Sequence, residues 1–211
     1  MHLVLLGDSI LDNGAYVERG GSVLERVQRH LGPQAQVTLL AQDGAVIANT
    51  LDQLDQVPRD ATHLVLSAGG NDALRNTGVL LEQASSVAEA LGKIEPVRDR
   101  FARDYRGLLD RLATLQLPAA ICTIYDVQLS DPIQRRMSNL ALGLLNDVIT
   151  RAAVRRRWPV IDLRVLFDDP SDYANAIEPS AAGAEKIAAV AAEIARNHDF
   201  AGPSSFYAQS R

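Results

Sequence analysis

The chain has 211 residues, of which 47% are hydrophobic, and it carries a formal net charge of −5. This length and apolar content fit one folded domain with a sizeable core and argue against an intrinsically disordered chain. A weakly acidic chain has no overall electrostatic attraction to nucleic acid or to an anionic membrane. We therefore expect neither of these as a partner.

Short apolar runs alternate with amphipathic segments along the chain. In chain order, we predict a strand at 3–6, a helix at 22–31, strands at 36–40 and 63–66, a helix at 99–115, a strand at 119–124, a helix at 133–157, a strand at 160–163 and a helix at 181–196. This alternation predicts an α/β fold with a parallel sheet and helices on both faces. Right-handed crossovers then give a three-layer α/β/α sandwich, flavodoxin-like, with a five-stranded parallel sheet.

We predict a single domain over residues 1–198 and a loose C-terminal tail over 199–211, which is polar and contains Gly and Pro. Residues 76–93 have two interpretations, a small helical excursion over the site or an early start of the next helix. The first apolar run is too short to span a membrane and lacks the flanks of a signal peptide, so we expect a cytoplasmic protein. Cys122 lies in an apolar run and is predicted to be a buried core residue.

Polar and glycine residues follow the predicted strands where each strand ends. Ser9 follows the first strand, Gly44 the second and Asn71 the third, while Glu178 precedes the last helix. Ligands of open parallel sheets bind beyond the carboxyl ends of the strands, so these residues should converge. A serine hydroxyl needs a neighbouring base to act as a nucleophile, and acyl transfer needs N–H donors for an oxyanion. The set therefore indicates acyl transfer.

These segments resemble, in order, the four sequence blocks of the SGNH hydrolase superfamily, also called the GDSL family. They are Gly-Asp-Ser-Ile around Ser9, Gly44, Gly-Gly-Asn-Asp around Asn71, and Glu-Pro-Ser before the last helix, and the likeness spans residues 3 to about 196. The resemblance implies the SGNH hydrolase fold and a small-molecule ester substrate, with no cofactor or metal. It also implies that Ser9 is the nucleophile and that the Ser9 N–H, the Gly44 N–H and the Asn71 side chain form the oxyanion hole.

The last block departs from the family pattern of Asp-x-x-His followed by Pro-Ser. The corresponding positions hold Asn175 and Glu178. In one interpretation Glu178 is the base for Ser9, its pKa raised by burial, and Asn175 orients it. In the other, the site has lost its base and only binds an ester or carbohydrate-like ligand. Arg164 would lower the pKa of Glu178 if it lies beside it; otherwise it is a surface residue or a loop clamp.

No histidine is expected to replace the missing base. His2 and His63 open strands and should lie at the opposite edge of the sheet, while His30 and His198 belong to helices away from the site. We therefore predict a serine esterase that acts on small acyl or acetyl esters, with Glu178 at the base position.

A magnesium site for phosphoryl transfer is a third hypothesis. Several acidic residues follow the predicted strands and could gather at the same edge: Asp8, Asp12, Asp43, Asp72 and Asp126. Aspartate is also common in turns and helix caps for local hydrogen-bonding reasons. The magnesium hypothesis leaves Ser9, Gly44 and Asn71 without a role.

Overall fold

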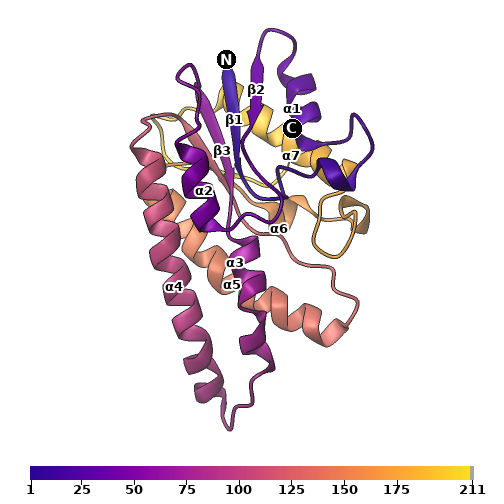
Figure 1. Cartoon of the computed structure of the whole chain (residues 1–211), viewed down its shortest axis with the longest axis vertical. Helices are drawn as coiled ribbons and strands as arrows, with labels where there is room; N and C mark the ends of the chain where they lie inside the picture. The colour runs from indigo at the N-terminus through magenta and orange to yellow at the C-terminus, as the bar shows by residue number, and fades with distance from the viewer. Residues whose placement is uncertain (210–211) are drawn as a thin grey trace.

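Six parallel strands form the central sheet of the computed structural model, which describes residues 1–209 (Figure 1). They are β1 (His2–Gly7), β2 (Gln36–Leu39), β3 (His63–Ser67), β4 (Ala119–Cys122), β5 (Val160–Ile161) and β6 (Phe206–Tyr207). Their order across the sheet is β2-β1-β3-β4-β5-β6. The predicted parallel α/β sandwich is confirmed, and the first five strands follow the flavodoxin-like order.

The sheet has one strand more than predicted. Strand β6 lies in the segment expected to be a loose tail and pairs in parallel with β5. The backbone N–H groups of Val160 and Asp162 donate to the carbonyl oxygens of Ser205 and Tyr207, each at 2.8 Å. A two-residue strand is too short for an apolar periodicity, so only its pairing with β5 reveals it.

Seven α-helices and three short 3₁₀ helices complete the described residues. The α-helices are α1 (Val23–Leu31), α2 (Ile47–Leu54), α3 (Gly70–Arg75), α4 (Val87–Ala113), α5 (Pro132–Arg155), α6 (Leu163–Leu166) and α7 (Ala181–Asn197). The 3₁₀ helices are η1 (Gly14–Tyr16), η2 (Thr77–Leu81) and η3 (Pro170–Asp172). Both interpretations of residues 76–93 hold in part, because η2 is a helical excursion and α4 begins at Val87.

Alternate residues of the strands point to two separate cores. Val4 and Leu6 pack with α2, α4 and α5 on one face of the sheet, whereas Leu3 and Leu5 pack with α1 and α7 on the other. Side chains alternate between the faces of a strand, so a continuous apolar run is required when both faces are covered. This arrangement explains why β1 is buried along its whole length.

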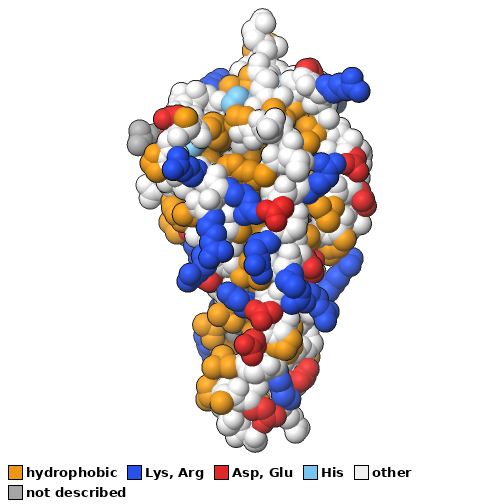
Figure 2. Space-filling view, turned by 90° about the vertical axis from the view of Figure 1, so that its left-hand side faces the viewer, with side chains coloured by type: hydrophobic (Ala, Val, Ile, Leu, Met, Phe, Trp, Pro, Cys, Tyr) orange, Lys and Arg blue, Asp and Glu red, His pale blue; other side chains and the backbone are white. Residues whose placement is uncertain are grey.

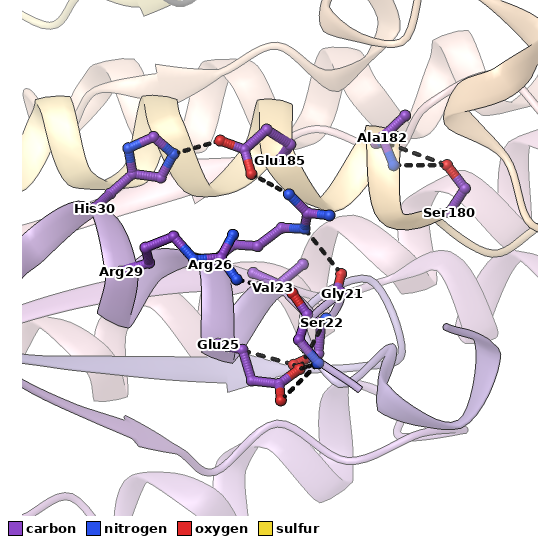
Figure 3. A network of polar contacts seen from close by, with 12 residues as sticks. Gly21, Ser22, Val23, Glu25, Arg26, Arg29, His30, Ser180, Ala182 and Glu185 are labelled. Carbon is purple, nitrogen blue, oxygen red and sulfur yellow. Dashed lines mark hydrogen bonds and ion pairs between the residues drawn. The ribbon is translucent and has the colours of Figure 1, made fainter. Parts of the chain in front are cut away.

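Helices α1 and α7 are joined by a polar network (Figure 3). Arg26 and His30 of α1 both contact Glu185 of α7, the latter with 2.6 Å between His30 Nε2 and Glu185 Oε1. Helix α1 begins with a capping box, in which Ser22 accepts from the Glu25 N–H and Glu25 in turn accepts from the Ser22 N–H. The network holds α7 against α1, and α7 begins at Ala181, three residues after Glu178.

The first half of α4, η2 and the start of α5 project beyond the carboxyl edge of the sheet (Figure 1). Figure 2 shows the side of the molecule where α4 lies, with Lys and Arg side chains across its middle and hydrophobic side chains exposed at its narrow lower end. None of the helices within residues 1–209 is both long enough and apolar enough to cross a membrane. The cytoplasmic location stays a prediction.

Candidate active site

Ser9 lies directly beyond the end of β1 and is buried. The chain leaves β1 through Gly7, whose φ of +123° favours glycine, and a Cβ there would lie only 1.6 Å from the Ser67 carbonyl oxygen. The Gln53 side chain accepts from the Gly7 N–H at 2.7 Å and donates to its carbonyl oxygen at 2.9 Å. Gly7 thus lets β1 and β3 approach closely, and Gln53 fixes the turn that carries Ser9.

Asn71 lies in the first turn of α3, which follows β3. Gly69 precedes this helix with a φ of +113°, and a Cβ there would lie 2.8 Å from the Phe101 ring. The Asn71 Nδ2 donates to the Ala45 carbonyl oxygen at 2.9 Å. An amide group carries two N–H bonds, so the second remains able to donate to a ligand. Strands β1 and β3 are neighbours, but the chain continues from β1 to β2 on one side and from β3 to β4 on the other. Ligands of open parallel sheets bind beyond the carboxyl ends of two such strands, which is where Ser9 and Asn71 lie.

Gly44 lies in the exposed turn between β2 and α2, with a φ of +77°. This turn is tied to α3 by the hydrogen bond between Asn71 and Ala45. Ser9, Asn71 and Glu178 line a common cavity, and Gly44 is not among the described residues that line it. The structure therefore brings three of the predicted residues together and places Gly44 in an adjacent turn.

Glu178 is 5% exposed, and its Oε2 is buried without a hydrogen-bond partner among the described residues. Burial raises the pKa of this carboxyl group to about 7, while the Ser9 hydroxyl lowers it by hydrogen bonding and the negative charge of Asp43 raises it. Arg164 does not offset the burial, because its guanidinium binds Asp162 instead, with Nη2 to Oδ2 at 2.6 Å. Arg164 is thus an exposed residue that pairs locally with Asp162, in line with its interpretation as a surface residue or loop clamp.

Asn175 is exposed, and its Oδ1 accepts from the Ile177 N–H at 2.9 Å. This is a local turn contact, common for asparagine. Within residues 1–209, Asn175 makes no hydrogen bond to Glu178. The orienting role that we predicted for Asn175 therefore finds no contact in the structure.

Two residues without an assigned role in the sequence hold the segment that carries Glu178. The Asn13 Nδ2 donates to the Pro179 carbonyl oxygen at 3.2 Å, and the Tyr125 hydroxyl donates to the Ile177 carbonyl oxygen at 2.6 Å. These contacts lie on either side of Glu178 in the sequence. Asn13 and Pro179 are 166 residues apart in the sequence, so no local pattern reveals this contact.

Asp8 is a second buried carboxyl group of the same cavity. Burial raises its pKa to about 7, although the Ile10 N–H and the Ser67 hydroxyl lower it by donating hydrogen bonds, each at 3.2 Å. The negative charges of Glu178 and Asp72 raise it further. Two carboxyl groups with raised pKa values therefore border one cavity, a pattern that active sites often show.

The cavity has a volume of about 470 Å³. It extends from the carboxyl edge of the sheet, where Ser9, Asn71 and Glu178 lie, into the space among η2, the first half of α4 and the start of α5. Most of the side chains from these helices are apolar. The site thus combines a polar end, which contains a serine hydroxyl and two carboxyl groups, with a long apolar lining.

The four histidines lie elsewhere, as predicted. His2 contacts Thr38 and Asp60, His63 contacts Thr62, His30 contacts Glu185 and His198 contacts Tyr207. Among residues 1–209, none of them lines the cavity. Among the residues expected from the sequence, Glu178 is therefore the candidate base, since it lines the cavity with Ser9 and the Ser9 hydroxyl lowers its pKa. Cys122 is buried, as predicted, and burial raises its pKa well above the usual value.

The acidic residues considered for magnesium have other contacts. Asp12 accepts from the Asp43 N–H at 3.0 Å, Tyr16 donates to Asp43 at 2.6 Å, and Asp72 accepts from the Ile47 N–H at 3.0 Å. No group of three or more His, Cys, Asp or Glu side chains in the described part of the chain could hold a metal ion. These aspartates stabilise the loops at the edge of the sheet.

The model of the GDSL-like lipase/acylhydrolase family matches residues 5–186. A search of curated proteins found no match. Among solved structures, a lipolytic protein of the G-D-S-L family from Veillonella parvula superposes with a TM-score of 0.68 at 15% identity, covering 93% of this chain and 98% of its own.

Two further structures show the same fold. A lipase/acylhydrolase from Enterococcus faecalis has a TM-score of 0.66 at 18% identity, covering 92% of this chain and 94% of its own. The acetyl xylan esterase AlAXEase has a TM-score of 0.65 at 16% identity, covering 89% of this chain and 96% of its own. At these identities the structural likeness establishes the fold and leaves the substrate open.

Proposed function

The chain belongs to the GDSL-like lipase/acylhydrolase family, and from this premise we propose that it is a serine esterase in which Ser9 is the nucleophile and Glu178 the base. The observation that carries the proposal is the pairing of these two side chains in one cavity. The Ser9 hydroxyl lowers the pKa of Glu178, and the Oε2 of this carboxyl group has no hydrogen-bond partner among the described residues. Such a carboxylate is free to accept the proton of the serine.

The proposed reaction has two halves. In the first, the Ser9 Oγ attacks the ester carbonyl carbon as its proton passes to Glu178, and the resulting oxyanion accepts hydrogen bonds from the Ser9 N–H, the Gly44 N–H and the second N–H of Asn71. Collapse of the tetrahedral intermediate breaks the ester C–O bond, and Glu178 returns the proton to the departing alcohol. In the second half, water attacks the acyl-enzyme carbonyl carbon and gives a proton to Glu178. Collapse of this second intermediate breaks the bond between the acyl carbon and the Ser9 Oγ, and Glu178 returns the proton to Ser9 as the acid leaves.

Burial makes the use of a carboxylate reasonable. An ordinary glutamate, with a pKa of 4.5, is a weak base at neutral pH, whereas Glu178 has a pKa of about 7. A general base is most effective when its pKa lies near the working pH. The environment thus gives Glu178 a basicity close to that of an imidazole.

A second candidate function is binding without efficient turnover. The observation that favours it is that no histidine lines the cavity among residues 1–209. Loss of one member of a serine triad leaves only the residual catalysis of the oxyanion hole and substrate binding. In that case the cavity would hold an ester or carbohydrate-like ligand.

The deciding experiment is hydrolysis of p-nitrophenyl acetate, a small acetyl ester of the kind predicted from the sequence. We expect Ser9→Ala and Glu178→Gln each to lower kcat by about a hundredfold or more, as loss of a nucleophile or base does. Ser171→Ala and Glu18→Gln are matched controls, because both residues are exposed and neither lines the cavity. They should retain the wild-type rate.

A covalent probe gives a second measurement. A fluorophosphonate should label the wild type at Ser9, and mass spectrometry should find no label on Ser9→Ala. If Ser9→Ala hydrolyses the ester at the wild-type rate, the esterase proposal is wrong. A wild type that takes no label and turns over no ester, but binds the ester, supports the second candidate.

A further inference from the structure

The apolar part of the cavity is larger than an acetyl ester requires. Residues of η2, α4, α5 and the loop before α5 provide most of the lining of a cavity of about 470 Å³. Resting on the esterase function proposed above, we propose that this region binds the acyl chain of medium- or long-chain acyl esters. The projecting helices are then an acyl-binding cap, defined as residues 76–98 and 127–145.

The sequence of α5 is arranged for such a cap. Ile133, Met137, Ala141 and Leu145 recur at every fourth position and all line the cavity. Residues at this spacing form one stripe along a helix, so the first half of α5 presents a continuous apolar surface to the cavity. On α4, Ile94 and Val97 provide the opposite wall by the same rule.

Part of this stripe remains in water. Ile133 and Met137 are 62% and 44% exposed although they line the cavity, and Leu81 of η2 is 78% exposed. Contiguous exposed apolar surface at the mouth of a pocket usually marks a ligand-binding groove. An acyl chain in the groove would remove this surface from water.

The catalytic residues determine the chemistry of the occupant. Ser9, Asn71 and Glu178 border the same cavity, so its occupant must carry a reactive carbonyl group at one end and an apolar tail at the other. Arg98 also lines the cavity, but it contacts Asp99 at 2.9 Å. The buried acids Asp8 and Glu178 disfavour a negatively charged head group. An uncharged acyl ester meets all of these conditions.

The scale of the effect follows from the hydrophobic effect. Moving one methylene group from water into an apolar site changes an equilibrium constant about fourfold. If the cap binds the tail, kcat/KM should rise from p-nitrophenyl butyrate to octanoate by about tenfold or more. A site that recognises only the ester group would show no such rise.

Variants of α5 give a matched test. Met137→Glu places a charge in the groove, and Leu140→Glu places the same charge on the same helix, at a residue that is 71% exposed and does not line the cavity. We expect Met137→Glu to lower the ratio of kcat/KM on p-nitrophenyl octanoate to kcat/KM on p-nitrophenyl acetate by about tenfold or more. Leu140→Glu should keep the wild-type dependence on chain length. Ala141→Trp fills the groove with a large side chain and adds no charge. It should also lower kcat/KM on p-nitrophenyl octanoate.

A binding measurement separates this proposal from the esterase function. Titration calorimetry of Ser9→Ala with 2-decanone, an uncharged ketone, should detect binding that acetone does not show and that Met137→Glu abolishes. If no ester is hydrolysed but 2-decanone binds in this way, the esterase function fails and the acyl-binding cap stands. If p-nitrophenyl acetate and p-nitrophenyl octanoate react equally well and 2-decanone does not bind, the proposal of an acyl-binding cap is overturned.

Discussion

The side-chain amide of Asn13 donates a hydrogen bond of 3.2 Å to the carbonyl oxygen of Pro179. Asn13 follows the Ser9 block, and Pro179 follows Glu178, so one buried side chain joins the segments that carry the proposed nucleophile and base. The same side chain accepts from the Val23 N–H at 2.9 Å, where α1 begins. Asn13 is 0% exposed, so no water can replace these contacts without a rearrangement.

We expect Asn13→Ala to lower the free energy of unfolding by about 1–3 kcal/mol, because it leaves the Val23 N–H and the Pro179 carbonyl buried without partners. Urea denaturation measures this change. Asn175→Ala is the matched control in the same region, since Asn175 makes only an exposed turn contact. An equal loss of stability in the two variants would contradict a special role for the Asn13 contact.

The pKa of Glu178 predicts how stability depends on pH. The folded state holds this proton up to about pH 7, whereas the unfolded chain releases it near 4.5. Between these values the folded state binds more protons, so the free energy of unfolding should fall as pH rises. The pKa of Asp8 is also raised to about 7, so Asp8 contributes a further decrease in the free energy of unfolding as pH rises.

Glu178→Gln should make this decline shallower and should be more stable than the wild type at pH 8, because the buried negative charge is removed. Urea denaturation from pH 4.5 to pH 8 measures both effects. Asp8 remains in the variant, so part of the decline should persist. A wild-type stability that rises with pH across this window would show that the two carboxyl groups are not protonated in the folded state.

Activity should show the opposite dependence on pH. Glu178 accepts the Ser9 proton only when ionised, so kcat/KM should fall about tenfold for each pH unit below a pKa of about 7. A carboxylate base usually keeps an enzyme active at lower pH than a histidine base, but burial removes that distinction here. A profile of kcat/KM against pH with p-nitrophenyl acetate measures this fall at low pH. Activity that stays constant down to pH 5 would exclude a base with this pKa.

Gly69 connects β3 to the helix that carries Asn71. Its φ of +113° is unfavourable for other residues, and an added Cβ would lie 2.8 Å from the Phe101 ring. We expect Gly69→Ala to lower the free energy of unfolding by about 1–3 kcal/mol, a usual cost of a strained backbone conformation. Thermal denaturation measures the change.

Gly78→Ala is the control for this prediction, because Gly78 has no positive φ and an added Cβ would have no neighbour within 4 Å. It should differ from the wild type by less than about 0.5 kcal/mol, as most surface substitutions do. If Gly69→Ala is as stable as Gly78→Ala, the Phe101 ring moves away without cost and the turn is not strained.

The sequence determined the parallel α/β sandwich, because buried strands between amphipathic helices produce a pattern that one chain displays by itself. It also predicted that Ser9, Asn71 and Glu178 converge, since each follows a strand or precedes a helix at the same edge of the sheet, and the three residues do line one cavity. The first two belong to blocks with a fixed local geometry. These features depend on neighbours in the sequence and could therefore be predicted.

Tertiary structure decided the remaining features. Strand β6 exists only through its pairing with β5, and Asn13 acts through Pro179, which lies far away along the chain. The basicity of Glu178 comes from burial, and the apolar cavity from packing among η2, α4 and α5. Burial, long-range hydrogen bonds and cavities depend on which segments meet in space. The sequence could therefore name the residues proposed for catalysis, while only the fold shows the burial that raises the pKa of Glu178 and the cavity beside Ser9.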